Sequence, residues 1–227
     1  MNSSGIRIAG AALVVVVGIW AGAKFHSVHS AAADHRGIPV PAGDASPPNP
    51  SDFAEGAMPT VKIPDRLPQF SLADRAGKVT PISSFAGKSL IINFWATWCA
   101  PCRSEIPLLE SLHAEWAGRD VSVVGIAVDH RDKVLEFADR FKIGYPLLIG
   151  EQDALDAVAA FGVEDPVFPF TVFTDRRGEV VTVFVGELHK PQAEFILSEV
   201  QNVNTGVLQM AAARHSIAAG LRALAAP

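Results

Sequence analysis

The order of apolar segments predicts an α/β fold, in which a mixed central sheet is flanked by helices. From residue 89 onward, runs typical of buried strands alternate with segments whose apolar residues recur at helical spacing. Two further apolar runs, 170–174 and 179–185, flank the turn sequence Asp-Arg-Arg-Gly and indicate a hairpin. Strand–helix alternation that ends in a hairpin favours a sheet with both parallel and antiparallel neighbours.

Length and composition limit the number of domains and the classes of partner. The chain has 227 residues, of which 49% are hydrophobic, so one domain of about 150 residues with extensions is expected. The formal net charge is −5, which lacks the basic excess that marks nucleic-acid-binding proteins. We therefore expect no nucleic-acid partner.

The N-terminal segment, residues 1–25, predicts export. Its uncharged apolar run, 8–23, is slightly longer than the core of a signal peptide, about 7–15 residues, and shorter than the roughly 20 residues of a membrane span. The segment is either a cleaved signal peptide or an N-terminal anchor in the inner membrane, and we favour the anchor. The rest of the chain is then expected in the periplasm or an equivalent extracytoplasmic space.

Residues 26–60 and 204–227 are expected to flank the domain. The first stretch is rich in Pro and Ala without a hydrophobic period, which is typical of an extended linker. Its three histidines, at 26, 29 and 35, are expected to be solvated. The second stretch predicts a helical extension that packs on the domain.

Residues 61–203 are expected to form the domain itself. Its predicted elements, in chain order, are strands at 67–72, 79–85 and 89–95, a helix at 103–116, a strand at 121–128, a helix at 133–141, a strand at 145–149, a helix at 153–161, the hairpin strands and a helix at 190–203. The run 121–128 is continuously apolar, as expected for a strand covered on both faces.

The only two cysteines of the chain, Cys99 and Cys102, lie where the strand at 89–95 passes into the next helix. Unpaired N–H groups and the macrodipole at a helix N-terminus stabilise a thiolate and lower its pKa from about 8.5 to roughly 3.5–7.5. Pro101 suits a first helical turn, because no N–H is needed there. We expect Cys99 to be the exposed nucleophile and Cys102 the inward-facing resolving thiol of a dithiol–disulfide exchange.

A purely structural role for the cysteine pair fits the sequence less well. A structural pair would not need to lie at the N-terminus of a helix. A structural zinc site needs four ligands, and the chain has no second cysteine pair to complete one.

The segment Trp98-Cys99-Ala100-Pro101-Cys102 resembles the thioredoxin fold, specifically the exported TlpA/ResA-like thiol–disulfide oxidoreductases. The resemblance covers about residues 63–203. It rests also on the following segments: 91–97, Arg103-Ser104-Glu105-Ile106-Pro107, Val128-Asp129, Tyr145-Pro146-Leu147-Leu148, and Pro169 with the hairpin turn at 175–178. Together these motifs are highly specific.

The resemblance implies roles for two further residues. Pro169 falls where the family has a cis-proline facing the cysteines, whose exposed backbone groups pair with a substrate strand. Glu105 matches the family's inward acid, which exchanges protons and raises the pKa of nearby thiols by like-charge repulsion. Asn93 occupies the position where cytosolic thioredoxins carry a buried acid, so a proton relay here must use Glu105.

The loop that precedes Pro169 departs from the family pattern. Residues 161–169 are two residues longer than usual, and the bulky Phe168 stands where smaller residues are common. We expect Trp98, Pro101 and Phe168 to contact substrate, with Phe168 forming a hydrophobic lip for an apolar or aromatic client segment.

The function implied is that of a reductant of particular protein disulfides. The expected clients are proteins with cysteine pairs, in cytochrome c maturation or respiratory copper-site assembly, and a membrane thiol protein is expected to supply electrons. No cofactor is expected beyond the redox-active Cys99–Cys102 disulfide.

Two alternative functions remain open. A thioredoxin-fold peroxidase resembles Pro-x-x-x-Thr-x-x-Cys, whereas Thr97 precedes Cys99 by only two residues. A copper-binding chaperone resembles Cys-x-x-x-Cys with a distant His, and the spacing here is one residue shorter.

Overall fold

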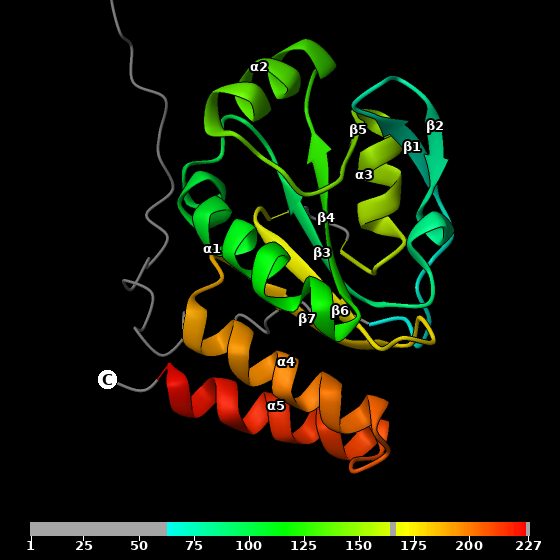
Figure 1. Ribbon diagram of the computed structural model, residues 1–227, viewed down its shortest axis with the longest axis vertical. Coiled ribbons are helices and arrows are strands. Elements are labelled where there is room, and N and C mark those ends of the chain that lie inside the picture. The colour runs from blue at the N-terminus through cyan, green and yellow to red at the C-terminus, as the bar shows by residue number, and fades with distance from the viewer. Residues whose placement is uncertain (1–62, 164–166, 226–227) are drawn as a thin grey trace, which may run out of the picture. The chain divides into compact units, whose positions relative to one another are not determined.

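The computed structural model describes residues 63–163 and 167–225. The predicted signal peptide or anchor and the linker, together with residues 164–166 of the loop before Pro169, lie outside the described residues. The described chain contains a seven-stranded mixed sheet in the order β2-β1-β5-β4-β3-β6-β7, flanked by helices (Figure 1). The predicted fold class is confirmed.

The strands β3, β4, β6 and β7 agree closely with the expected elements, whereas β1, β2 and β5 differ in their bounds. Their bounds are β1 Ser71–Asp74, β2 Val79–Pro81, β3 Ser89–Trp95, β4 Val121–Val128, β5 Leu147–Gly150, β6 Phe170–Thr174 and β7 Val180–Val185. Strands β3, β4 and β5 are parallel neighbours, and the other pairs are antiparallel. Strand β3 therefore lies inside the sheet, and its C-terminal end leads to the cysteines.

Helices cover both faces of this sheet. Their bounds are α1 Ala100–Trp116, α2 Arg131–Phe141, α3 Gln152–Ala159, α4 Lys190–Asn204 and α5 Met210–Leu224. Side chains of β3 alternate between two apolar cores, because successive residues of a strand point to opposite faces. Ile91 and Trp95 pack with α1, α2 and α4, whereas Ile92 and Phe94 pack with α3. All seven residues of β3 are buried.

Several element boundaries differ from the sequence expectation. The strand predicted at 67–72 is β1 at Ser71–Asp74, because Pro68 in the predicted segment has no N–H to donate to a ladder. Helix α1 begins at Ala100 rather than at residue 103, because Pro101 is compatible with a first turn. The segment 79–85 divides into the short edge strand β2 and a 3₁₀ turn at Ile82–Phe85. Strand β5 begins at Leu147, since Pro146 has no N–H with which to extend the ladder.

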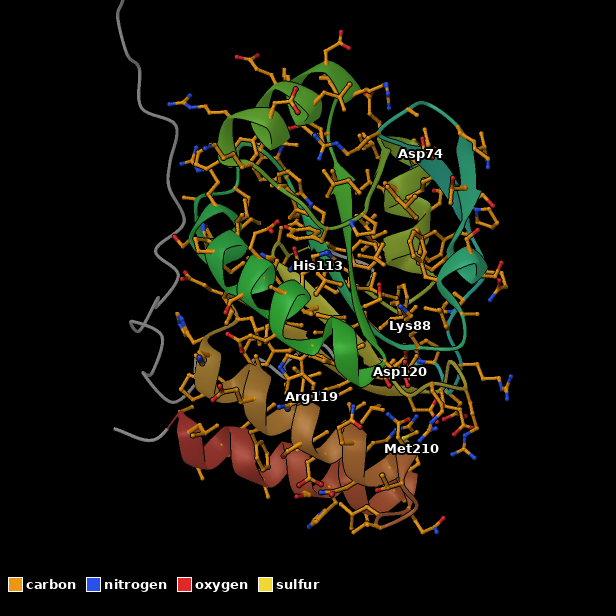
Figure 2. The ribbon with its side chains drawn as sticks, in the orientation of Figure 1. Asp74, Lys88, His113, Arg119, Asp120 and Met210 are labelled. Atoms are coloured by element: carbon orange, nitrogen blue, oxygen red, sulfur yellow. A yellow bond between two sulfur atoms is a disulfide. The ribbon has the colours of Figure 1, made fainter. Side chains whose placement is uncertain are left out.

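The C-terminal extension packs on the domain, as expected. Figure 1 shows α5 beside α4, and Ala213 and Ile217 are buried there. Met210 is the first residue of α5 (Figure 2). Arg214 ties the helix to β7, because its Nη2 donates to the Val180 carbonyl at 2.7 Å.

Within residues 63–163 and 167–225, none of the helices combines the length and the apolar character that crossing a membrane would require.

Candidate active site

The two cysteines form a disulfide at the N-terminus of α1. Their sulfurs are 2.00 Å apart and their Cα atoms 5.3 Å apart. A tight turn joins β3 to this site, in which the Cys99 N–H donates to the Ala96 carbonyl at 3.2 Å. The chain thus passes directly from a buried strand into the first turn of a helix that carries the second cysteine.

Cys102 is buried as expected, whereas Cys99 is less exposed than predicted. Cys99 retains 5% of its surface and Cys102 retains 1%. The exposed nucleophile predicted from the sequence is therefore covered, since Ala96, Trp95 and the first turn of α1 pack around it in one core. The Cys102 N–H points at the Cys99 Sγ, 3.2 Å away, where it would stabilise a thiolate after reduction.

Glu105 lies inside the protein, one helical turn after Cys102. Its Oε1 accepts a hydrogen bond from Asn93 Nδ2 at 2.7 Å, and its Oε2 accepts one from the Leu188 N–H at 2.8 Å. The same Asn93 Nδ2 contacts Thr171 Oγ1 at 3.0 Å. Burial raises the pKa of Glu105 from 4.5 to about 7, although both hydrogen bonds favour the charged form.

This environment defines what Glu105 can do chemically. Glu105 is not a solvated glutamate of the helix surface, because the residue is 1% exposed. With a pKa near 7, the carboxyl group can either release or take up a proton near neutral pH. Since Glu105 and Cys102 are three residues apart, they project from the same side of α1.

Pro169 lies at the same end of the sheet as the cysteines. The Phe168–Pro169 peptide bond is cis, as the resemblance implied. Strand β6 begins at the next residue, and Phe94 of β3 pairs with Phe170. Continuing this antiparallel register places Pro169 opposite Trp95, the last residue of β3.

A groove of about 490 Å³ runs beside Trp98. Its lining comes from the cysteine turn, the starts of α2 and α3 and the loop before β6, and consists of Trp98, Val128, Asp129, His130, Glu151, Gln152, Leu155 and Phe168. The Trp98 ring is 67% exposed and meets Phe168 edge to face, with ring centroids 6.1 Å apart. Pro101 is exposed and does not line this groove.

Residues 63–183 match the AhpC/TSA family, which spans more than half of the chain. The chain belongs to the AhpC/TSA family. Among curated proteins similar to this chain, the thiol-disulfide oxidoreductase ResA of Geobacillus kaustophilus is 30% identical over 142 residues, covering 62% of this chain and 79% of that protein.

Two solved structures share the fold at similar identity. A thiol:disulfide interchange protein of the thioredoxin family from Chlorobium tepidum is 34% identical, with a TM-score of 0.51, covering 56% of this chain and 90% of that one. A secreted thiol-disulfide isomerase from Corynebacterium glutamicum is 28% identical, with a TM-score of 0.51, covering 56% and 80%. This AhpC/TSA member is thus a ResA-like thiol–disulfide oxidoreductase with a thioredoxin-like fold.

One contact of this family member's site was missed in the sequence. Asp129, at the end of β4, accepts hydrogen bonds from both the backbone N–H and the hydroxyl of Thr97. The sequence placed Asp129 only among the family markers. An acidic residue directly after a continuous apolar strand was the available signal, because such a carboxylate needs donors when it is buried.

The raised pKa of Glu105 predicts a pH-dependent stability difference. The folded state keeps the Glu105 proton up to about pH 7, whereas the unfolded chain releases it near 4.5. The contribution of Glu105 to the free energy of unfolding is therefore greatest below pH 4.5. It falls by about 3 kcal/mol in total as the pH rises through 7.

Glu105→Gln cannot titrate and should abolish this dependence. We expect the wild type to lose about 3 kcal/mol of unfolding free energy relative to Glu105→Gln between about pH 4.5 and pH 8, measured by urea denaturation. A constant difference across this range would show that Glu105 does not keep its proton on folding.

Proposed function

We propose that this oxidoreductase is exported and reduces specific protein disulfides with its Cys99–Cys102 dithiol. The observation that carries the proposal is the position of this pair at the N-terminus of α1, with the buried carboxyl group of Glu105 one turn further along. In this proposal residues 1–25 are a signal peptide or inner-membrane anchor and residues 26–60 a linker. Residues 61–203 are the catalytic domain and 204–227 its helical extension.

The reaction proceeds in two exchanges. The Cys99 thiolate attacks one sulfur of the client disulfide, forming a mixed disulfide and releasing one client thiolate. Cys102, which gives up its proton to Glu105, then attacks Cys99 Sγ, releases the second client thiolate and closes the enzyme disulfide. Two electrons pass to the client, and the released thiolates take up the protons.

The environment of Glu105 supports the reducing direction. A carboxylate beside the dithiol destabilises thiolates by like-charge repulsion. A strong oxidant needs the opposite, a reduced form with a very stable thiolate. The reduced enzyme therefore gives up electrons readily, and a membrane thiol protein restores it. The family resemblance supports apocytochrome c or a respiratory copper-site protein as client.

The groove beside Trp98 supports a client segment with an apolar or aromatic side chain. Trp98, directly before Cys99, offers exposed surface beside the half-buried ring of Phe168, and Pro169 directly precedes the adjoining strand β6. An extended client segment would lie along this end of the sheet, with its cysteine over Cys99 and an apolar neighbour in the groove.

Cys102→Ser should trap the client. Without the resolving thiol, the mixed disulfide at Cys99 cannot be released, so incubation of the reduced variant with a disulfide-containing peptide should yield a stable covalent adduct. Non-reducing electrophoresis and mass spectrometry detect this adduct, and Cys99→Ser is the matched control that should form none. Equal trapping by Cys99→Ser would contradict the assignment of Cys99 as the attacking thiol and Cys102 as the resolving thiol.

The same preparations test the alternatives. Consumption of hydrogen peroxide at Cys99 without exchange activity would favour the peroxidase, and stoichiometric copper(I) binding without exchange would favour the chaperone.

Phe168→Thr should weaken client binding selectively. Loss of the aromatic contact removes about 1 kcal/mol, so KM for a peptide with an aromatic residue beside its disulfide should rise roughly three- to tenfold. Turnover of a small disulfide should be unchanged, because it does not reach the groove. The matched control is Val167→Thr, a neighbour that is 56% exposed and does not line the groove. Identical KM values for both variants would contradict the assignment of Phe168.

A further inference from the structure

The turn that presents Cys99 is held from another strand. Asp129 follows β4, which lies beside β3, and it is only 8% exposed. Its Oδ2 accepts from the Thr97 N–H at 3.3 Å and also from the Thr97 hydroxyl, and its Oδ1 accepts from the His130 N–H at 2.7 Å. Both carboxylate oxygens are thus occupied by donors from two separate segments.

These contacts act on the short turn between β3 and α1. Between the end of β3 at Trp95 and the start of α1 at Ala100, the turn is closed by the bond from the Cys99 N–H to the Ala96 carbonyl. Thr97 lies in the middle of this turn, and Asp129 is the side chain that anchors it to β4. The position of Cys99 Sγ near the Cys102 N–H depends on the same turn.

We propose that Asp129 is a positioning residue, which acts through Thr97 to hold the Cys99 turn in its reactive geometry. The inference rests on the proposed role of Cys99 as the attacking thiol. Asp129 itself need not touch the client disulfide. Asp129 also lines the groove beside Trp98. The same residue therefore holds the Cys99 turn and forms part of the proposed client-binding surface.

Two different roles for Asp129 would produce different results. If the carboxylate acted through its negative charge alone, its removal would favour the Cys99 thiolate and speed its reaction. If it were only a structural cap, its loss would lower stability without changing the chemistry. A positioning role requires instead that the reaction slow while the fold persists.

Thr97→Val tests the proposal without changing any charge. It keeps the shape and the backbone N–H but removes the hydroxyl donor. We expect client kcat/KM to fall about tenfold, and alkylation of reduced Cys99 by iodoacetamide at neutral pH to slow roughly threefold, because small displacements of a reacting group cost much rate. Thr97→Ser, which keeps the hydroxyl, should restore both values.

Asp129→Asn and Asp175→Asn form a matched pair. Asp175 is also a buried aspartate that accepts backbone N–H groups, from Arg177 and Glu179, but it lies in the β6–β7 hairpin turn. Both variants should lower the melting temperature, whereas only Asp129→Asn should also lower kcat/KM.

Three results would count against the proposal. Wild-type rates in Thr97→Val, or faster alkylation in Asp129→Asn, would overturn the positioning role. Mass spectrometry of the alkylated wild type tests the proposed function separately, because it shows which cysteine is labelled first. If Cys102 is labelled before Cys99, both the positioning role and the proposed function are overturned.

Discussion

The two cysteines lie at the junction between the buried strand β3 and the first turn of helix α1. The rest of the site depends on the geometry of this junction. Strand β3 is buried along its whole length, so the position of its end is set by packing on both faces and by pairing with β4 and β6. Helix α1 begins five residues later with unpaired N–H groups. A nucleophilic sulfur placed there is stabilised by these backbone N–H groups and by the helix dipole.

Burial of Glu105 couples this junction to proton transfer. Asn93 of β3 and the Leu188 N–H before α4 fix the carboxyl group inside the core, while burial raises its pKa to about 7. The same burial that costs stability at neutral pH therefore keeps an exchangeable proton beside the dithiol. The groove beside Trp98 has no lining residue in common with the surroundings of Glu105, so client recognition and proton transfer use different side chains.

Local pattern was enough to predict the framework, but not the contacts that connect its parts. The strands 89–95 and 121–128 agree with the expected bounds, because each is a predominantly apolar run that begins directly after a charged residue. Glu105 was expected to point inward from the family resemblance, and its three-residue spacing from Cys102 agrees with that. Its partner at Leu188, 83 residues away, and the Thr97–Asp129 contact, 32 residues away, depend on tertiary packing that no local period encodes.

The reduction potential of the Cys99–Cys102 couple tests the central claim most directly. It is measured by equilibrating the whole protein with glutathione or dithiothreitol buffers and quantifying the free thiols. The buried carboxyl group and the proposed reducing role predict a value near or below that of thioredoxin, about −270 mV. A value near −120 mV, roughly that of a strong oxidant, would contradict the account and make the protein a donor of disulfides.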